Sequence, residues 1–222
     1  MTAPPYQYVI NEEEDEDGLE KEDRDKVLIL FLPILIQLIG NRMFDTTSML
    51  RDREIDFLQW SGRVQAIIKD AHETAYGMGM VKAGLIPSTE VQTKAAEAIV
   101  LEQQEFFESL QRDIVDGRYT NPDGSIRTDP INTRLFNYSK RIRGTANRAW
   151  FDNIPFTTLV MWQLGQKEHC QPTQGFDFTC PELAARGFIS KSAMPTVPGE
   201  CKTPCYFNCG CEIVTRDGQT SF

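Results

Sequence analysis

A chain of 222 residues, of which 41% are hydrophobic, is long enough to bury one substantial core together with a small appended module. Ten acids and only two bases fall between Glu12 and Asp25, so this stretch carries −8 of the total formal charge of −9. The remainder is nearly neutral, and it lacks the clustered Lys and Arg residues that nonspecific binding to DNA phosphates requires.

The first 25 residues are predicted to form a disordered acidic tail, because like charges repel and few apolar side chains are available for burial. We interpret the tail as solvated, and docking onto a basic partner surface is the alternative. Its acids precede the first apolar run, whereas a secretory signal begins with basic residues. We therefore expect the chain to fold in a reducing compartment.

Residues 25–45 contain the most hydrophobic run of the chain, VLILFLPILIQLI, from Val27 to Ile39. Its thirteen residues fall short of the roughly 20 that a membrane-spanning helix needs, so we expect a buried or partner-binding helix and no membrane association. Pro33 should kink this helix or mark its first turn. Association of identical chains in a ring would bury the apolar surface formed by Phe31, Leu35 and Leu38.

Three further helices are predicted from apolar residues that recur every three or four positions. The first runs from about Thr47 to Met80, with a candidate interruption at residues 61–62. The second starts at a cap-like Ser88 and stops at Gly117. The third, from about Pro130 to Phe151, is the one basic helix, and its basic residues are Arg134, Lys140, Arg141, Arg143 and Arg148.

The basic helix has two interpretations. A solvated helix face is the simpler one. The alternative is contact with an acidic protein surface or with nucleic acid, and the residues predicted to bind such a partner are Arg141 and Arg143.

After Asp152 the sequence changes character. The run TTLVMWQLG, residues 157–165, is rich in β-branched and aromatic residues and predicts a short strand. Five prolines and all six cysteines follow, without a long periodic run. The sequence therefore predicts an α+β fold that is mainly α, with a helical domain over residues 26–151 and a small Cys-rich module of loops and strands over residues 152–222.

The six cysteines are candidates for a structural metal site. Structural zinc takes four Cys or His ligands, and the candidates are Cys170, Cys180, Cys201, Cys205, Cys209 and Cys211, with His169 as a nitrogen ligand. The last four follow the spacing C-x3-C-x3-C-x-C, which differs from the common pairs of C-x2-C, so a disulfide framework is the second interpretation.

A catalytic cysteine is the least favoured interpretation. A nucleophilic thiol needs a positioned base, and the chain has only two histidines, His72 and His169. His72 lies within a predicted amphipathic helix, where we interpret it as a surface or packing residue.

The order of motifs from about residue 70 onward resembles a known family. The helices carry AYGMGMVKAGL at 75–85, LEQQEFFESLQRDIVDG at 101–117 and RGTANRAW at 143–150. A W-x-L-x4-H-C…C-x-x-L-A segment and a P-x-x-P-G…T-x-C-x-x-N-C-x-C-x-I ending follow, at Trp162, Leu164, His169, Cys170, Cys180, Leu183, Ala184, Pro195, Pro198, Gly199, Thr203, Cys205, Asn208, Cys209, Cys211 and Ile213. This pattern is similar to that of the phage head morphogenesis family, the Mu-type minor head proteins and their counterparts in Gram-positive phages.

The resemblance implies a structural protein of the virion, made in the host cytoplasm and located at the portal vertex of the phage head, and not an enzyme. Its partners would be the portal protein and other head or neck proteins, with a role in head assembly or head–tail connection. Two alternatives stay open: the portal adaptor itself, and a DNA-binding zinc module that contacts packaged DNA. We expect zinc or disulfides to join Cys170, Cys180, Cys205, Cys209 and Cys211, and Cys201 is an extra thiol relative to the family pattern.

Overall fold

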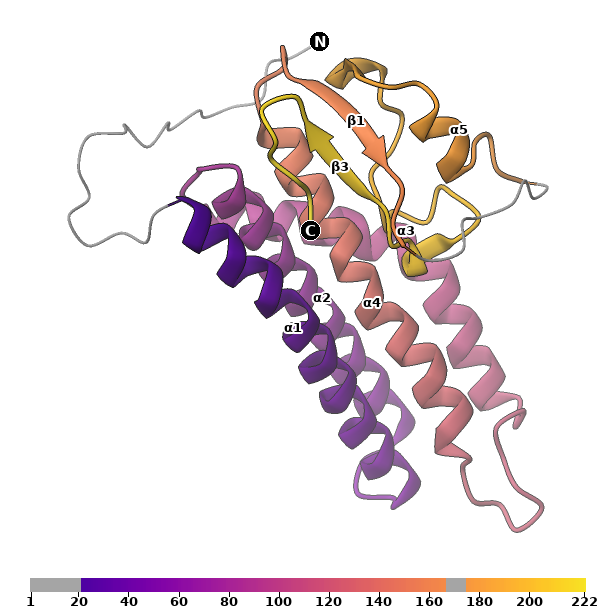
Figure 1. Ribbon diagram of the computed structural model, residues 1–222. Coiled ribbons are helices and arrows are strands. Elements are labelled where there is room, and N and C mark those ends of the chain that lie inside the picture. The colour runs from indigo at the N-terminus through magenta and orange to yellow at the C-terminus, as the bar shows by residue number, and fades with distance from the viewer. Residues whose placement is uncertain (1–20, 167–174) are drawn as a thin grey trace.

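The computed structural model describes residues 21–166 and 175–222, and it is mainly helical with one small antiparallel sheet (Figure 1). Four long helices come first: α1 (Lys21–Arg51), α2 (Phe57–Lys82), α3 (Thr89–Val115) and α4 (Thr128–Asn153). The elements that follow are β1 (Leu159–Gln163), α5 (Cys180–Ala184), β2 (Ile189–Ser190), β3 (Glu212–Thr215) and the short 3-10 helices η1 (Lys191–Ala193) and η2 (Tyr206–Asn208). The predicted class, α+β and mainly α with a Cys-rich C-terminal region, is confirmed.

The first helix is longer at both ends than the sequence predicted. It begins at Lys21 and not near Asp25, and it ends at Arg51. Pro33 lies inside α1, well beyond its first turn, so the prediction that it could mark the helix start is wrong. The predicted tail therefore loses its last five positions to the helix, and residues 1–20 lie outside the described residues.

The break between α1 and α2 falls at residues 52–56, so the predicted interruption at residues 61–62 is wrong. Arg53 takes a left-handed backbone conformation, with a φ of 62°, just after α1 ends. Asp56 then caps α2. Its carboxylate accepts the backbone N–H of Gln59 at 2.8 Å, and its own N–H donates to the side-chain oxygen of Gln59 at 3.0 Å. This reciprocal pair satisfies two N–H groups that would otherwise lack partners, and it fixes the helix start.

The helical body has α2 in its centre, where it packs against α1, α3 and α4. Successive helices are joined by short connections and reverse direction (Figure 1). The apolar side chains that face this core from α1 recur at helical spacing, at Leu32, Leu35, Ile39, Met43 and Leu50. The body is therefore held by continuous apolar stripes, which the periodicity of the sequence predicted for the helices after α1.

The helices α2 and α4 approach one another closely at Gly79. A Cβ atom at this position would lie 2.6 Å from the Cβ atom of Ala149 and 2.8 Å from the backbone nitrogen of Trp150. It would also clash with the carbonyl oxygen of Ala146. Glycine is therefore required for this crossing, because any side chain would push the two helices apart.

His72 is fully buried and connects α2 to both α3 and α4. Its Nε2 atom lies 2.8 Å from the amide nitrogen of Gln103, and its Nδ1 atom lies 2.7 Å from the hydroxyl of Thr145. Because an amide nitrogen only donates, Nε2 accepts and Nδ1–H donates to Thr145. Burial lowers the pKa of His72 to about 3, and the positive charge of Arg141 adds to this effect. His72 is therefore a neutral packing residue, one of the two roles predicted for it.

The sheet has the strand order β2-β1-β3 and is antiparallel throughout. Trp162 lies opposite Ile213 and Val160 lies opposite Thr215, so alternate residues of β1 and β3 share one buried face. This face packs against Leu183 of α5 and against the end of α4. A second apolar core thus forms beside that of the helical body, and α4 contributes to both.

Candidate metal centre

Four cysteines of the C-terminal region converge on one point. The Sγ atom of Cys180 lies 3.5 Å from that of Cys205 and 3.7 Å from that of Cys209. The Sγ atoms of Cys180, Cys209 and Cys211 all lie within 4.8 Å of one another, and these three side chains are buried. Three buried cysteines therefore lie close enough to hold a metal ion, and the half-buried Cys205 lies beside them as a fourth thiol.

Local backbone structure brings the last three thiols together. Cys209 has an extended backbone conformation, and the segment through Gly210 and Cys211 leads directly into β3. Residues two apart in an extended chain point to the same side, which suits the C-x-C spacing. Between Cys205 and Cys209, η2 makes one tight helical turn and returns the chain toward its starting point.

Cys180 comes from a separate part of the chain and is positioned by the start of α5. It is the first residue of this helix, directly after the cap residue Thr179. The carboxylate of Glu182 accepts the backbone N–H of Thr179 at 2.6 Å, and the Thr179 hydroxyl accepts the N–H of Glu182 at 3.4 Å. Pro181 supports the same start because its φ is already helical. The sequence T-C-P-E therefore begins a helix and directs Cys180 inward, where it is 1% exposed.

The distances between the sulfur atoms differ from those of a disulfide. A disulfide joins two sulfurs about 2.05 Å apart, far less than the 3.5 and 3.7 Å measured from Cys180. In a tetrahedral site with Zn–S bonds of about 2.3 Å, neighbouring sulfurs lie about 3.8 Å apart. The spacing is therefore compatible with several thiolates around one ion.

The pKa values of the clustered thiols are shifted in different directions because the thiols are buried and in contact with one another. Contacts with Cys205, Cys209 and Cys211, together with burial, raise the pKa of Cys180. For Cys209, the contact with Cys180 lowers the pKa, but contacts with Cys205 and Cys211 and burial outweigh it and raise the pKa overall. Contacts with Cys180 and Cys209 lower the pKa of Cys211. All four thiols can ionise together only if a cation replaces their protons, which is the chemistry of a metal site.

Neutral donors surround Cys211 on its other side. The backbone N–H of Gly165 and the indole N–H of Trp162 both favour its thiolate form. The Trp162 nitrogen is buried and makes no hydrogen bond of regular geometry within the described residues. A Cβ atom on Gly165 would clash with the carbonyl of Gly210, so only glycine allows this approach. Sequence analysis missed Gly165, although a glycine at the end of a strand is a local signal of close backbone contact.

One face of α4 fastens the Cys-rich module to the helical body. Gly144 and Gly199 touch backbone to backbone, and a Cβ atom on Gly199 would lie 3.0 Å from the nitrogen of Gly144. The side chain of Asn147 donates to the carbonyl of Pro198 at 2.9 Å and accepts the N–H of Phe222 at 2.7 Å. The module therefore rests on α4 through main-chain contacts, which leave little freedom to shift.

Arg143 lies on the same face of α4, and its predicted role in partner binding stays a prediction. Its guanidinium donates to the backbone carbonyls of Cys209 and Cys211, the latter at 3.1 Å. It also donates to the carbonyl of Phe222, at 2.6 and 2.9 Å. Four hydrogen bonds of the Arg143 side chain are thus made with the C-terminal module of its own chain.

Three other basic residues of α4 also form hydrogen bonds or ion pairs within the chain. Arg148 forms a two-bond ion pair with Glu200 at 2.5 and 2.6 Å. Arg134 donates to Asp113 at 2.5 Å, and Lys140 donates to the side chain of Asn208 at 3.3 Å. Arg141 is half-buried near Cys201 and His72, and its predicted role in partner binding stays a prediction.

Of the other predicted ligands, only Cys201 is described by the structure. His169 and Cys170 lie outside the described residues. Cys201 has a left-handed backbone, with a φ of 63°, and its Sγ atom lies 3.8 Å from the carbonyl oxygen of Gly199. Burial raises the pKa of its thiol. The prediction that Cys201 is an extra thiol relative to the family pattern stays a prediction.

An apolar face of α1 is exposed, away from the metal centre. Phe31 is 42% exposed and Leu38 is 50% exposed, alongside Val27, Leu30 and Ile34. Leu35 is only 8% exposed and packs in the core of the helical body, so its predicted role in partner binding is wrong. The segment Asp23–Arg51 is also long and apolar enough to cross a membrane by length and composition alone, a property that core helices of soluble proteins share.

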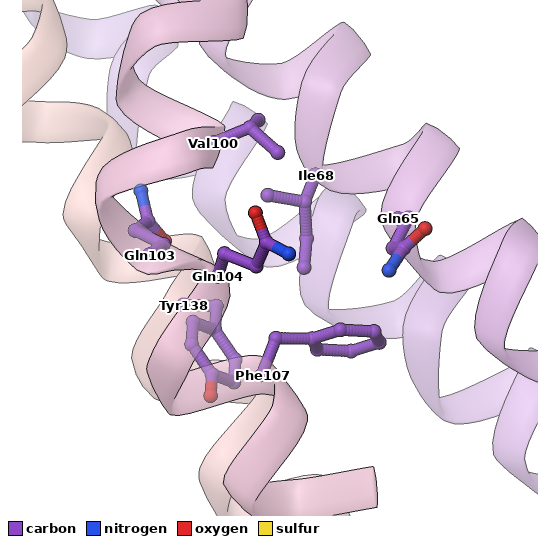
Figure 2. Close-up of a pocket in the computed structure, with 7 residues that line it drawn as sticks. All are labelled: Gln65, Ile68, Val100, Gln103, Gln104, Phe107 and Tyr138. Carbon is purple, nitrogen blue, oxygen red and sulfur yellow. The ribbon is translucent and has the colours of Figure 1, made fainter.

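A hollow of about 240 Å³ opens between α2, α3 and α4 (Figure 2). Its lining consists of Gln65, Ile68, Val100, Gln103, Gln104, Phe107 and Tyr138. Tyr138 is the one ionisable group in this lining, and burial raises its pKa to about 12. The hollow therefore presents amide and apolar groups and is separate from the thiol cluster.

No protein-family model, no curated protein and no solved structure matches this chain. The geometry of the thiol cluster and the sequence pattern around it are the observations on which a function can be proposed.

Proposed function

We propose that this chain is a structural protein of a bacteriophage virion, a minor head protein at the portal or neck, whose C-terminal module is held together by a zinc ion. The supporting observation is that many of the described positions that resemble the minor head family pack together in the C-terminal module. Four of them supply the sulfurs of the cluster, at Cys180, Cys205, Cys209 and Cys211. Three others are at most 1% exposed and pack in the same core, at Trp162, Leu183 and Ile213.

Other positions of the same pattern attach the unit to α4. Pro198 and Gly199 make the main-chain contacts with this helix. The hydroxyl of Thr203 lies 3.1 Å from the Sγ atom of Cys205. These described positions of the resemblance therefore contribute both to the thiol cluster and to its attachment to α4.

Zinc is the metal that best fits this donor set. Sites made of thiolates alone favour zinc or iron–sulfur clusters, and sulfur atoms this close together suit a single ion. When bound, zinc would offset half of the charge of the four thiolates and join α5 to the segment before β3. Because four protein ligands leave no open position for a substrate, the role we propose for it is structural and not catalytic.

The exposed face of α1 is the surface we propose for association, either between identical chains in a ring or with the portal and neck proteins. Contiguous exposed apolar side chains often mark interaction sites. Val27, Leu30, Phe31, Ile34 and Leu38 recur at threes and fours and so form one stripe along the helix. Synthesis in the reducing host cytoplasm agrees with thiols that bind metal.

The test of location is a particle experiment. Mass spectrometry of purified virions and proheads should detect the chain in few copies, and a particle map should place it at the portal vertex. A place beneath the portal would favour the adaptor within the same functional class. Absence of the chain from both kinds of particle, or its recovery with host membranes instead, would contradict the proposal.

The test of the metal is elemental analysis of the chain purified without chelators. We expect one zinc ion per chain, lost in Cys209→Ser and retained in the matched control Cys201→Ser. A chain without zinc, whose native thiols all react with an alkylating reagent, would contradict the metal and disulfide interpretations alike.

The alternative of a DNA-binding zinc module has less support. Arg134, Arg143 and Arg148 all make hydrogen bonds within the chain, so they are poorly placed to neutralise phosphates. Binding to a DNA duplex that weakens steeply as salt rises is the result that would favour it.

A further inference from the structure

We propose that Arg143 of α4 is the positioning residue of the metal centre, and that it sets the metal affinity of a module to which it does not itself belong. The inference rests on the proposed zinc site and extends it, because it names a residue of the helical body as part of the site's support.

The guanidinium binds both ligand residues of the Cys–Gly–Cys segment. Its Nη1 atom donates to the carbonyl of Cys209 and its Nη2 atom donates to the carbonyl of Cys211 at 3.1 Å. Nε and Nη2 donate to the carbonyl of Phe222 at 2.9 and 2.6 Å. Four bonds to three carbonyls use nearly all of the five N–H donors of an arginine, and its planar fork fixes their relative positions.

These bonds matter because of the residue between the two ligands. Gly210 lacks a Cβ atom, so the backbone that joins Cys209 to Cys211 is intrinsically free to change conformation. The guanidinium holds the carbonyls on both sides of this glycine and so keeps the two thiols on one side of the chain. A site that is ordered before the metal arrives loses less conformational entropy on binding.

Charge acts in the same direction. Four thiolates around one divalent ion carry two net negative charges, and the protein must offset them in a buried place. The guanidinium places a positive charge on the main chain of two of the four ligands. Groups that support metal ligands in this way often affect metal affinity strongly.

Arg148 provides a matched control from the same helix. It also fastens the module, through its two-bond ion pair with Glu200 at 2.5 and 2.6 Å. Glu200 is not a proposed metal ligand. Loss of this ion pair should therefore loosen the attachment of the module without directly disturbing the backbone of any ligand residue.

The test compares Arg143→Gln, Arg143→Lys and Arg148→Gln with the unaltered full chain. Zinc affinity is measured by competition with a chromophoric chelator, ligand geometry by the absorption spectrum of the Co²⁺-loaded protein, and stability by thermal unfolding. We expect Arg143→Gln to weaken zinc binding by about 10–100-fold and to change the Co²⁺ spectrum. Arg143→Lys should weaken it less, because lysine keeps the charge but cannot bind three carbonyls in a fixed plane.

The control should separate positioning from general loosening. Arg148→Gln should lower the unfolding temperature while zinc affinity and the Co²⁺ spectrum stay as in the unaltered chain. The positioning role is overturned if Arg143→Gln binds zinc normally, or if both glutamine variants weaken zinc binding equally. Should Arg143→Gln fail to fold, Arg143→Lys decides, and normal zinc affinity in that variant overturns the role. An unaltered chain that binds no zinc would instead refute the metal centre, and this inference with it.

Discussion

The helical body and the Cys-rich module are stabilised in different ways. In the body, apolar stripes from α1 to α4 meet in one core that includes Trp60, Leu110 and Leu135, which are fully buried. In the module, a smaller apolar core surrounds the thiol cluster, and main-chain contacts to α4 supply much of the rest. The body therefore relies on repeated burial, whereas the module relies on a few contacts that have no substitute nearby.

This difference determines how each region should respond to damage. Loss of one apolar side chain in the body leaves many neighbouring contacts intact. Loss of one clustered thiol from the module would remove a proposed metal ligand, and with it the link between α5 and the segment before β3. We expect the largest effects in the module, and the predictions below run from there to the surface of the body.

The largest expected effect is that of Cys209→Ser or of a strong chelator. Either should unfold residues 175–222 together with β1 while α1 to α4 stay folded, because zinc binding contributes on the order of 10 kcal/mol to small structural modules. Hydrogen exchange read by mass spectrometry resolves the two regions. Cys201→Ser should change neither region, since its thiol lies outside the cluster. Simultaneous unfolding of both regions would show that they form one cooperative unit.

The second effect concerns the body and is a dependence of its stability on pH. His72 has a pKa of about 3 in the folded chain and 6.5 as its ordinary value. Between these values the unfolded state binds a proton that the folded state does not, so stability falls as pH drops from 6.5 towards 3. The loss reaches at most about 5 kcal/mol. Denaturant unfolding at a series of pH values measures it.

The control for this prediction is His72→Gln, which has no titrating group at position 72. Acid also releases metal from thiolates, so the unaltered chain and His72→Gln must be compared under the same conditions. The slope of stability against pH should be shallower in His72→Gln. Equal slopes would mean that the imidazole is not held neutral in the body.

Sequence reasoning succeeded in the two regions to different degrees. Periodicity located the helices of the body, because the apolar residues of each stripe lie three or four positions apart in the sequence. It misplaced the break before α2 because the capping pair of Asp56 and Gln59 was not recognised. It also could not tell which side of α1 faces the core, since Leu35 and Leu38 are equally apolar.

In the module, sequence identified the thiols but not their support. Arg143 lies 66 to 79 residues from the carbonyls that it binds, so no local pattern distinguishes it from a solvated basic residue. The closeness of Gly165 to Gly210 likewise depends on the tertiary fold. What was predictable was the set of ligand types, and what was not predictable was the long-range geometry that brings four of them together.

A smaller effect than those of the metal and of pH is expected where α2 crosses α4. Gly79→Ala adds a methyl group that must displace Ala149 and the main chain of α4, and overpacking of this kind costs about 1–3 kcal/mol. The matched control is Gly62→Ala in the same helix, where a Cβ atom meets nothing within 4 Å. That change should instead stabilise the body by about 0.5–1 kcal/mol, because alanine favours helix. Thermal unfolding of both variants checks the pair, and the same sign in both would contradict the close crossing.

The smallest effect on the stability of the chain is expected on the exposed face of α1, where the effect on assembly should be large. Leu38→Glu changes a half-exposed side chain, so the free energy of unfolding should shift by no more than about 0.5 kcal/mol. A charge at the C-terminal end of the apolar stripe should nevertheless prevent association, because burying an unpaired carboxylate is costly. Leu58→Glu, on α2 and 79% exposed, is the control that should still assemble. Light scattering of the purified chains and their incorporation into particles measure both variants, and full incorporation of Leu38→Glu would show that α1 is not the surface of association.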